Sequence, residues 1–217
     1  MKNLLAYPSA LVLIISNFIP LWGVLNWGWD SKQAVIMYWS ENLIIGFFTL
    51  LKMRKVIGET DLAKKKEKMW LFLAHFGGFC LGHGVFILIL LFGPTPGRDG
   101  QMNLEEVRFW EILPYVRTLT LAFGAAFMSH AFSYWQNYIG REEYTRSTLD
   151  QLFWQPYFRV IVVHLTIFGV YFLSGFMENA QAGAVALVFI KTIVDTAAHL
   201  AERYKFREIK TKWLETV

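Results

Sequence analysis

Ionisable side chains occupy hydrophobic stretches of this sequence, where they could bind a metal, hold a haem or move protons. They include all 5 histidines of the chain. A charged side chain at the centre of a bilayer costs at least ~2.5–3.5 kcal/mol on insertion scales, so such residues are usually paired or functional. Imidazole and carboxylate groups are zinc ligands, histidines are axial haem ligands, and both groups carry protons in membrane proteins. The residues concerned are Glu41, His75, His83, His130, His164, Lys191, Asp195 and His199.

Most of these groups are expected in one layer of the membrane. At about 1.5 Å of rise per residue, five of them lie about 6 to 12 Å from the cytoplasmic ends of their helices: His75, His130, His164, Asp195 and His199. Glu41 lies deeper, at about 16 Å on the same scale. Asp195 and His199 are four residues apart, so one helical face presents both. The spacing therefore predicts a shared polar site in the cytoplasmic half of the membrane.

Zinc is the ion that this set of side chains suits best. A catalytic zinc site has three protein ligands and a water molecule. We expect the ligands to be His75, His164 and His199, with His130 in reserve. Asp195 is expected to act as a further ligand or catalytic partner, and Glu41 as the general base on the bound water. The corresponding function is a metal-dependent hydrolase that acts on a lipid or another membrane-embedded substrate.

Other interpretations use the same residues. His75 and His164, at one depth on two helices, are a natural axial pair for a b-type haem. Acids and histidines in a bundle are also typical of proton-coupled transporters. A structural interpretation assigns the histidines to hydrogen bonds between helices, and Glu41 with Asn42 to a structural polar pair.

Membrane-spanning helices are the elements that must position these groups. Hydrophobic residues make up 55% of the 217 positions and aromatic residues 17%, more than a soluble domain of this length carries. A span needs about 20 mostly apolar residues. Windows of this kind are found at roughly 4–27, 32–52, 69–92, 116–138, 157–176 and 181–202. We therefore expect an all-α, polytopic bundle of about six transmembrane helices in a single domain, 1–217.

Lysine and arginine set the expected orientation. Positive charge gathers in the 52–68 connection, which an even number of spans places on the same side as the 139–156 connection and both termini. Loops rich in Lys and Arg stay in the cytoplasm, so both ends are expected there and the protein in the inner membrane. This bias serves topology, so no nucleic-acid partner is expected; the oligomeric state is left open.

Smaller features predict local structure. Asn103 with Glu106 has the spacing of a helix cap, which predicts a surface helix over 103–113, and Thr148 is expected to cap another over 148–154. Gly78 and Gly82 form a small-xxx-small pattern that favours close approach of a helix. Cys80, the single cysteine, cannot form an internal disulfide.

Several stretches resemble an uncharacterised family of small bacterial multi-pass membrane proteins: 38–42, 74–78, 82–84, 130–135, 159–164 and 195–199. The resemblance covers nearly the whole chain, implies a six-helix membrane domain and brings no known activity. The combination of a buried acid, a serine and an acid-xxx-His helix is also similar to the alkaline ceramidase and adiponectin receptor group, which holds zinc within the membrane. Here Asp195 and His199 stand where that group has two histidines, and six spans replace seven.

Overall fold

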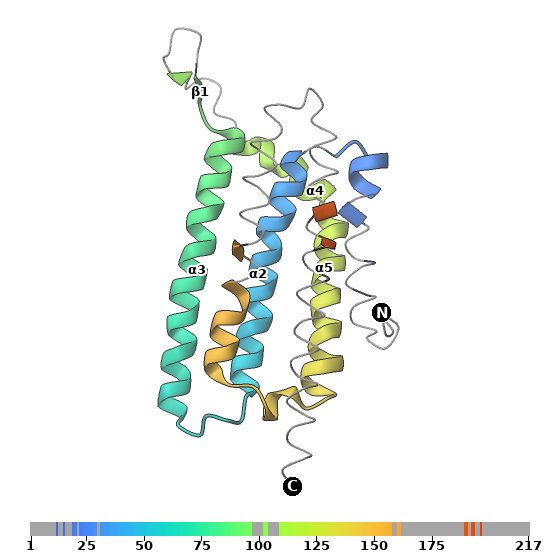
Figure 1. The fold of residues 1–217 in the computed structure, drawn as a ribbon. Coiled ribbons are helices and arrows are strands. Elements are labelled where there is room, and N and C mark those ends of the chain that lie inside the picture. Colours follow the sequence, from blue (N-terminus) through green and yellow to red (C-terminus); the bar gives the residue numbers. More distant parts are fainter. Residues whose placement is uncertain are drawn as a thin grey trace.

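The described part of the chain is a bundle of long helices (Figure 1). The computed structural model describes residues 22–29, 31–96, 102–103, 109–157 and 160–161, with positions 12, 15, 19–20, 189–190, 192–193 and 196. Within these residues the only strands are β1 (Thr95–Pro96) and β2 (Met102–Asn103), which pair antiparallel. The all-α prediction is confirmed at this level. Asn103 lies opposite Thr95 in β2. Residues 104–108, which it is predicted to cap, lie outside the described residues.

Among the described residues, two helices are long and apolar enough to cross a membrane: α2 (Ser31–Lys55) and α3 (Leu62–Phe92). They match the predicted spans 32–52 and 69–92, but α3 begins earlier than predicted. Asp61 caps its N-terminus, where Oδ1 accepts hydrogen bonds from the backbone N–H groups of Ala63 (2.9 Å) and Lys64 (3.3 Å). Charged residues that follow this cap are good helix formers, so they extend the helix beyond its apolar part.

The predicted span 116–138 is a bent element. It consists of a 3₁₀ turn (Phe109–Glu111), α4 (Ile112–Thr118), α5 (Thr120–Ser133) and a π-helix, η4 (Tyr134–Ile139). The axis bends by 55° at the break between α4 and α5, and counting this pair as one span raises the candidates to three. The other predicted spans, 4–27, 157–176 and 181–202, lie wholly or largely outside the described residues.

The helices run alternately up and down. Three helix ends meet at one end of the bundle: the end of α2, the start of α3 and the end of η4. There Lys52 lies over the Tyr138 ring, and Ile57 N–H donates to the Tyr144 carbonyl. We call this the basic end, since it carries the lysines of the 52–68 segment. At the opposite end Lys32 Nζ donates to the carbonyl of Leu91 (3.1 Å). The 52–68 and 139–156 connections therefore share one end, as the sequence predicts.

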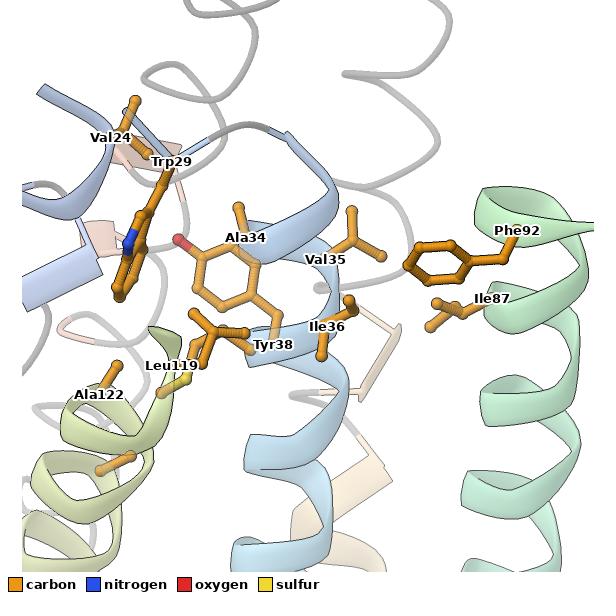
Figure 2. Packing of buried hydrophobic residues seen from close by; sticks show 12 residues of the cluster. Val24, Trp29, Ala34, Val35, Ile36, Tyr38, Ile87, Phe92, Leu119 and Ala122 are labelled. Carbon is orange, nitrogen blue, oxygen red and sulfur yellow. The ribbon is translucent and has the colours of Figure 1, made fainter. Parts of the chain in front are cut away.

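Apolar packing forms one cluster toward each end of the bundle. In the cluster at the opposite end, Val35 of α2 points toward Phe92 of α3, and the ring of Tyr38 extends toward Trp29 (Figure 2). The cluster at the basic end includes Met53, Phe72, Phe76 and Phe153. An apolar window of α2 is 61% buried, against 28% for α3. Helix α2 is therefore the central helix of the described part, and α3 lies on its outside.

Residues 149–157 form a further helix at the basic end, drawn in orange in Figure 1. Thr148 caps it as predicted: Gln151 N–H donates to Thr148 Oγ1 (3.2 Å) and Thr148 N–H to Gln151 Oε1 (3.3 Å). Leu149, Leu152 and Phe153 are buried in the basic-end cluster rather than presented on the surface. Lys68 pairs with Asp150 across this contact.

Glycines let α2 and α3 interlock. A Cβ built at Gly46 of α2 would lie 2.9 Å from the Phe76 ring, and one at Gly84 of α3 would lie 2.6 Å from the Trp39 ring. Trp39 Nε1–H also donates to the Cys80 carbonyl (2.8 Å). Gly78 and Gly82 are exposed, with no described atom within 4 Å of a Cβ built on them. The glycines that pack within the described bundle are therefore not the predicted pair.

Gly84→Ala should destabilise the protein by about 1–3 kcal/mol, because the new methyl group overlaps the Trp39 ring. Gly82→Ala is the matched control on the same helix, and it should be neutral or stabilising by up to about 1 kcal/mol through helix propensity alone. Unfolding of both variants in detergent measures the difference. Equal stability of the two variants would contradict the interlock.

Candidate functional site

A glutamate and a histidine meet between two helices of the bundle. Glu41 Oε1 of α2 and His130 Nε2 of α5 are 3.4 Å apart, with 7% and 14% of the respective side chains exposed. This distance is at the long end of the hydrogen-bond range. A carboxylate paired with an imidazole can hold one proton on either partner. The pair is thus an acid–base group in the interior of the bundle.

The helical faces around the pair are polar, as the sequence predicts. On α2, Tyr38, Asn42 and Thr49 are buried along with Glu41. On α5, Ser129 is buried next to His130, one turn after the buried Ala126. Small side chains on α5 let the two helices approach, so the polar groups of both face each other instead of lipid.

Aromatic rings border the site on the side of the basic end. The Phe48 ring stacks on the His130 imidazole, with centroids 6.2 Å apart and planes at 21°. Phe48 also contacts Phe127 at 5.3 Å and Tyr134 at 5.9 Å between centroids. Rings around the pair lower the local dielectric constant, which strengthens the interaction between the two groups.

His75 lies elsewhere. It is exposed on α3, and its Nδ1 shares a hydrogen bond of 2.6 Å with the Tyr157 hydroxyl. Among the described residues no three His, Cys, Asp or Glu side chains come together in a group that could hold a metal ion. His75 and His130 therefore do not join Glu41 in one such group. His164, Lys191, Asp195 and His199 lie outside the described residues.

His83 has a different environment again. It is half-buried on α3 and packs against Phe79, with ring centroids 4.4 Å apart.

Tyr157 was not anticipated as a partner of His75; the only signal was its position at the start of a predicted span. The Glu41–His130 contact also departs from the depth estimate, which placed Glu41 below the histidine layer.

A second group of polar residues lies at the basic end. The Tyr138 hydroxyl donates to the Lys52 carbonyl (2.9 Å), and Ser147 Oγ donates to the Glu143 carbonyl (2.8 Å). Glu143 and Ser147 are both buried. Sequence reasoning missed this group, because these residues follow the apolar window and have the composition of an ordinary polar loop.

Comparison with known families places the chain. The model of a family described as a family of unknown function, DUF6498, matches residues 2–212. The chain belongs to this family. Membership confirms the resemblance to an uncharacterised family and leaves the function to be argued from the site. No curated protein and no solved structure matches the chain.

Proposed function

We propose that this DUF6498 protein is a multi-pass inner-membrane enzyme with the Glu41–His130 pair as its acid–base centre. Its substrate would be a lipid or another membrane-embedded molecule. The observation that carries the proposal is a carboxylate–imidazole pair buried between helices, one of which is long and apolar enough to cross a membrane. Burial of two ionisable groups in such a bundle is costly, and it is a mark of function when the groups are paired.

The proposed topology has about six spans, on the count of apolar windows that each need about 20 residues, with both termini in the cytoplasm. The shared end of the 52–68 and 139–156 connections supports an alternating arrangement.

Reporter fusions after Lys66 and at Val217 should both give a cytoplasmic signal, because basic loops stay on that side. A fusion in the 93–111 connection is the matched control and should give the opposite signal. A periplasmic signal after Lys66 or at Val217 contradicts the topology.

The chemistry of the pair is general acid–base catalysis. The deprotonated pair takes a proton from a water molecule, whose oxygen then attacks the substrate. The same proton is returned to the leaving group, so each turnover leaves the pair as it began. Proton transfer by a positioned side chain contributes about 10²–10⁴-fold to a rate.

Zinc is the metal that we propose for this site. A histidine that binds zinc usually donates its other ring nitrogen to a carboxylate, and the Glu41–His130 contact supports that arrangement. His130 is therefore a stronger candidate ligand than the sequence alone suggests. His164 and His199 are proposed as the other ligands, with Asp195 as a ligand or catalytic partner. His75 is the weakest candidate, because it is exposed and hydrogen bonded to Tyr157.

Purified protein should contain about one zinc ion per chain and show no Soret band, since a site of this type is colourless. His130→Ala should lose the zinc, and His83→Ala, a histidine packed on Phe79, should keep it. Elemental analysis and an absorption spectrum of the same preparations decide the matter. A Soret band indicates haem instead, and absence of both metal and haem favours proton-coupled transport, for which the same buried pair would serve as a relay.

Glu41→Gln should fold and lose turnover by about 10²–10⁴-fold, because the amide keeps the shape of the side chain and removes its basic oxygen. Product release from an inner-membrane lipid extract, followed by mass spectrometry, measures the loss. Glu67→Gln, on the exposed start of α3, is the matched control and should keep full activity. Full activity of Glu41→Gln would remove Glu41 from the mechanism.

A further inference from the structure

A row of polar side chains leads from the Glu41–His130 pair toward the basic end. Ser133 follows His130 by three residues and Asn137 follows Ser133 by four, so the three share one face of the α5–η4 segment. Asn137 Nδ2–H donates to Ser133 Oγ (3.3 Å). The segment ends at Ile139, so Asn137 lies within the last turn before the basic end.

Asn137 has an unsatisfied polar atom at the end of this row. Asn137 is 1% exposed, and its Oδ1 accepts no hydrogen bond from the part of the chain that the structure describes. A buried oxygen left without a donor costs about 1–3 kcal/mol, so native proteins almost always satisfy such atoms. Ordered water is the usual donor when the protein supplies none. The orphaned oxygen therefore points to a bound water molecule.

The backbone around Asn137 is also unusual. Tyr134–Ile139 is a π-helix, in which Gly140 N–H donates to the Trp135 carbonyl (2.8 Å). Short π segments within α-helices are frequent at functional sites. Gln136, also in this segment, has a second buried oxygen, Oε1, without a donor. Two unsatisfied oxygens on adjacent residues of the π-helix make this the least well satisfied part of the described bundle.

Polar groups continue the row beyond Asn137. Tyr138, the next residue, donates to the Lys52 carbonyl, and Glu143 and Ser147 are buried in the connection that follows. This connection lies at the basic end, the end proposed to face the cytoplasm. Buried polar groups thus lie between the end of the bundle and His130 within the described residues.

We propose that this row conducts water and protons between the basic end and the Glu41–His130 pair, with Asn137 as its entry. The proposal rests on the proposed function and adds the route by which its acid–base centre exchanges protons. In each step a proton leaves one oxygen or nitrogen as a new O–H or N–H bond forms on the next. Water bound at Asn137 Oδ1 passes a proton to the Ser133 hydroxyl, which passes one of its own to the Glu41–His130 pair, where the Glu41 carboxylate accepts it. No oxidation or reduction is involved.

Accessibility to a water-soluble thiol reagent tests the route. The single native cysteine is replaced by Cys80→Ala, and Ser133→Cys is added as a nearly isosteric probe. The reagent is the membrane-impermeant (2-trimethylammonium)ethyl methanethiosulfonate, which reacts with thiolates, and thiolates form in water rather than in lipid. Met128→Cys is the matched control, since Met128 is exposed on the same helix away from the buried face. We expect the reagent to label the cysteine at position 133 from the basic side and to leave the cysteine at position 128 unlabelled. Lack of labelling at 133 would overturn the route.

Asn137→Leu in the Ser133→Cys background tests the entry. The leucine keeps the branched shape of the side chain and removes the oxygen that binds water, so labelling at position 133 should be lost. Unchanged labelling would remove Asn137 from the route. Zinc content and the effect of Glu41→Gln report on the proposed function separately. If position 133 is not labelled but zinc is bound and Glu41→Gln is inactive, the route is wrong and the proposed site is retained. If position 133 is labelled but zinc is absent and Glu41→Gln is active, the water path exists without the proposed chemistry.

Discussion

The contact between Glu41 and His130 is the interaction on which this account depends. Each group alone would be a costly charge or an unsatisfied polar atom inside an apolar bundle, and together they satisfy one another. The cost explains the surroundings of the pair: polar and small residues face it on both helices, and Phe48 covers the imidazole. The same contact joins α2 to α5, so the site and the helix pairing are one feature.

Helix α2 holds this arrangement because it packs on both sides. Toward α3 it interlocks through Gly46 and Trp39, each matched by a ring or a glycine of the other helix. Toward α5 it presents Tyr38, Glu41 and Asn42, all buried. One face of α2 is therefore specialised for tight packing and the other for polar contact. Substitutions at the α3 face are expected to act through stability, and those at the α5 face through chemistry.

The sequence predicts the parts of the fold that follow from local composition. The apolar windows locate α2 and most of α3, and the periodic polar positions of α2 identify its buried face. The bend at Leu119 is not predictable in this way, because the predicted window begins at 116 and leaves most of α4 outside it. The pairing of Asn103 with Thr95 is likewise not indicated by the spacing of Asn103 and Glu106, which predicts a helix cap.

The candidate site was predictable in its residue types and less so in its pairing. Depth along each helix separates Glu41 from His130 by about a turn, but a glutamate side chain extends across that distance. His75 is exposed and hydrogen bonded to Tyr157, a residue distant in the sequence, and it lies apart from the Glu41–His130 pair. The rotation of each helix about its axis determines which residues meet. A periodic sequence pattern predicts this rotation only where one face of the helix is clearly apolar, and α3 has no such face.

A double-mutant cycle with Glu41→Gln and His130→Gln tests the central contact most directly. Free energies of unfolding are measured for the wild type, both single variants and the double variant in the same detergent. Groups in contact typically show coupling of about 0.5–3 kcal/mol, and hydrogen bonds between membrane helices lie toward the lower end of that range. The account predicts that the second substitution costs less once the first is present. Additive effects of the two substitutions would contradict it.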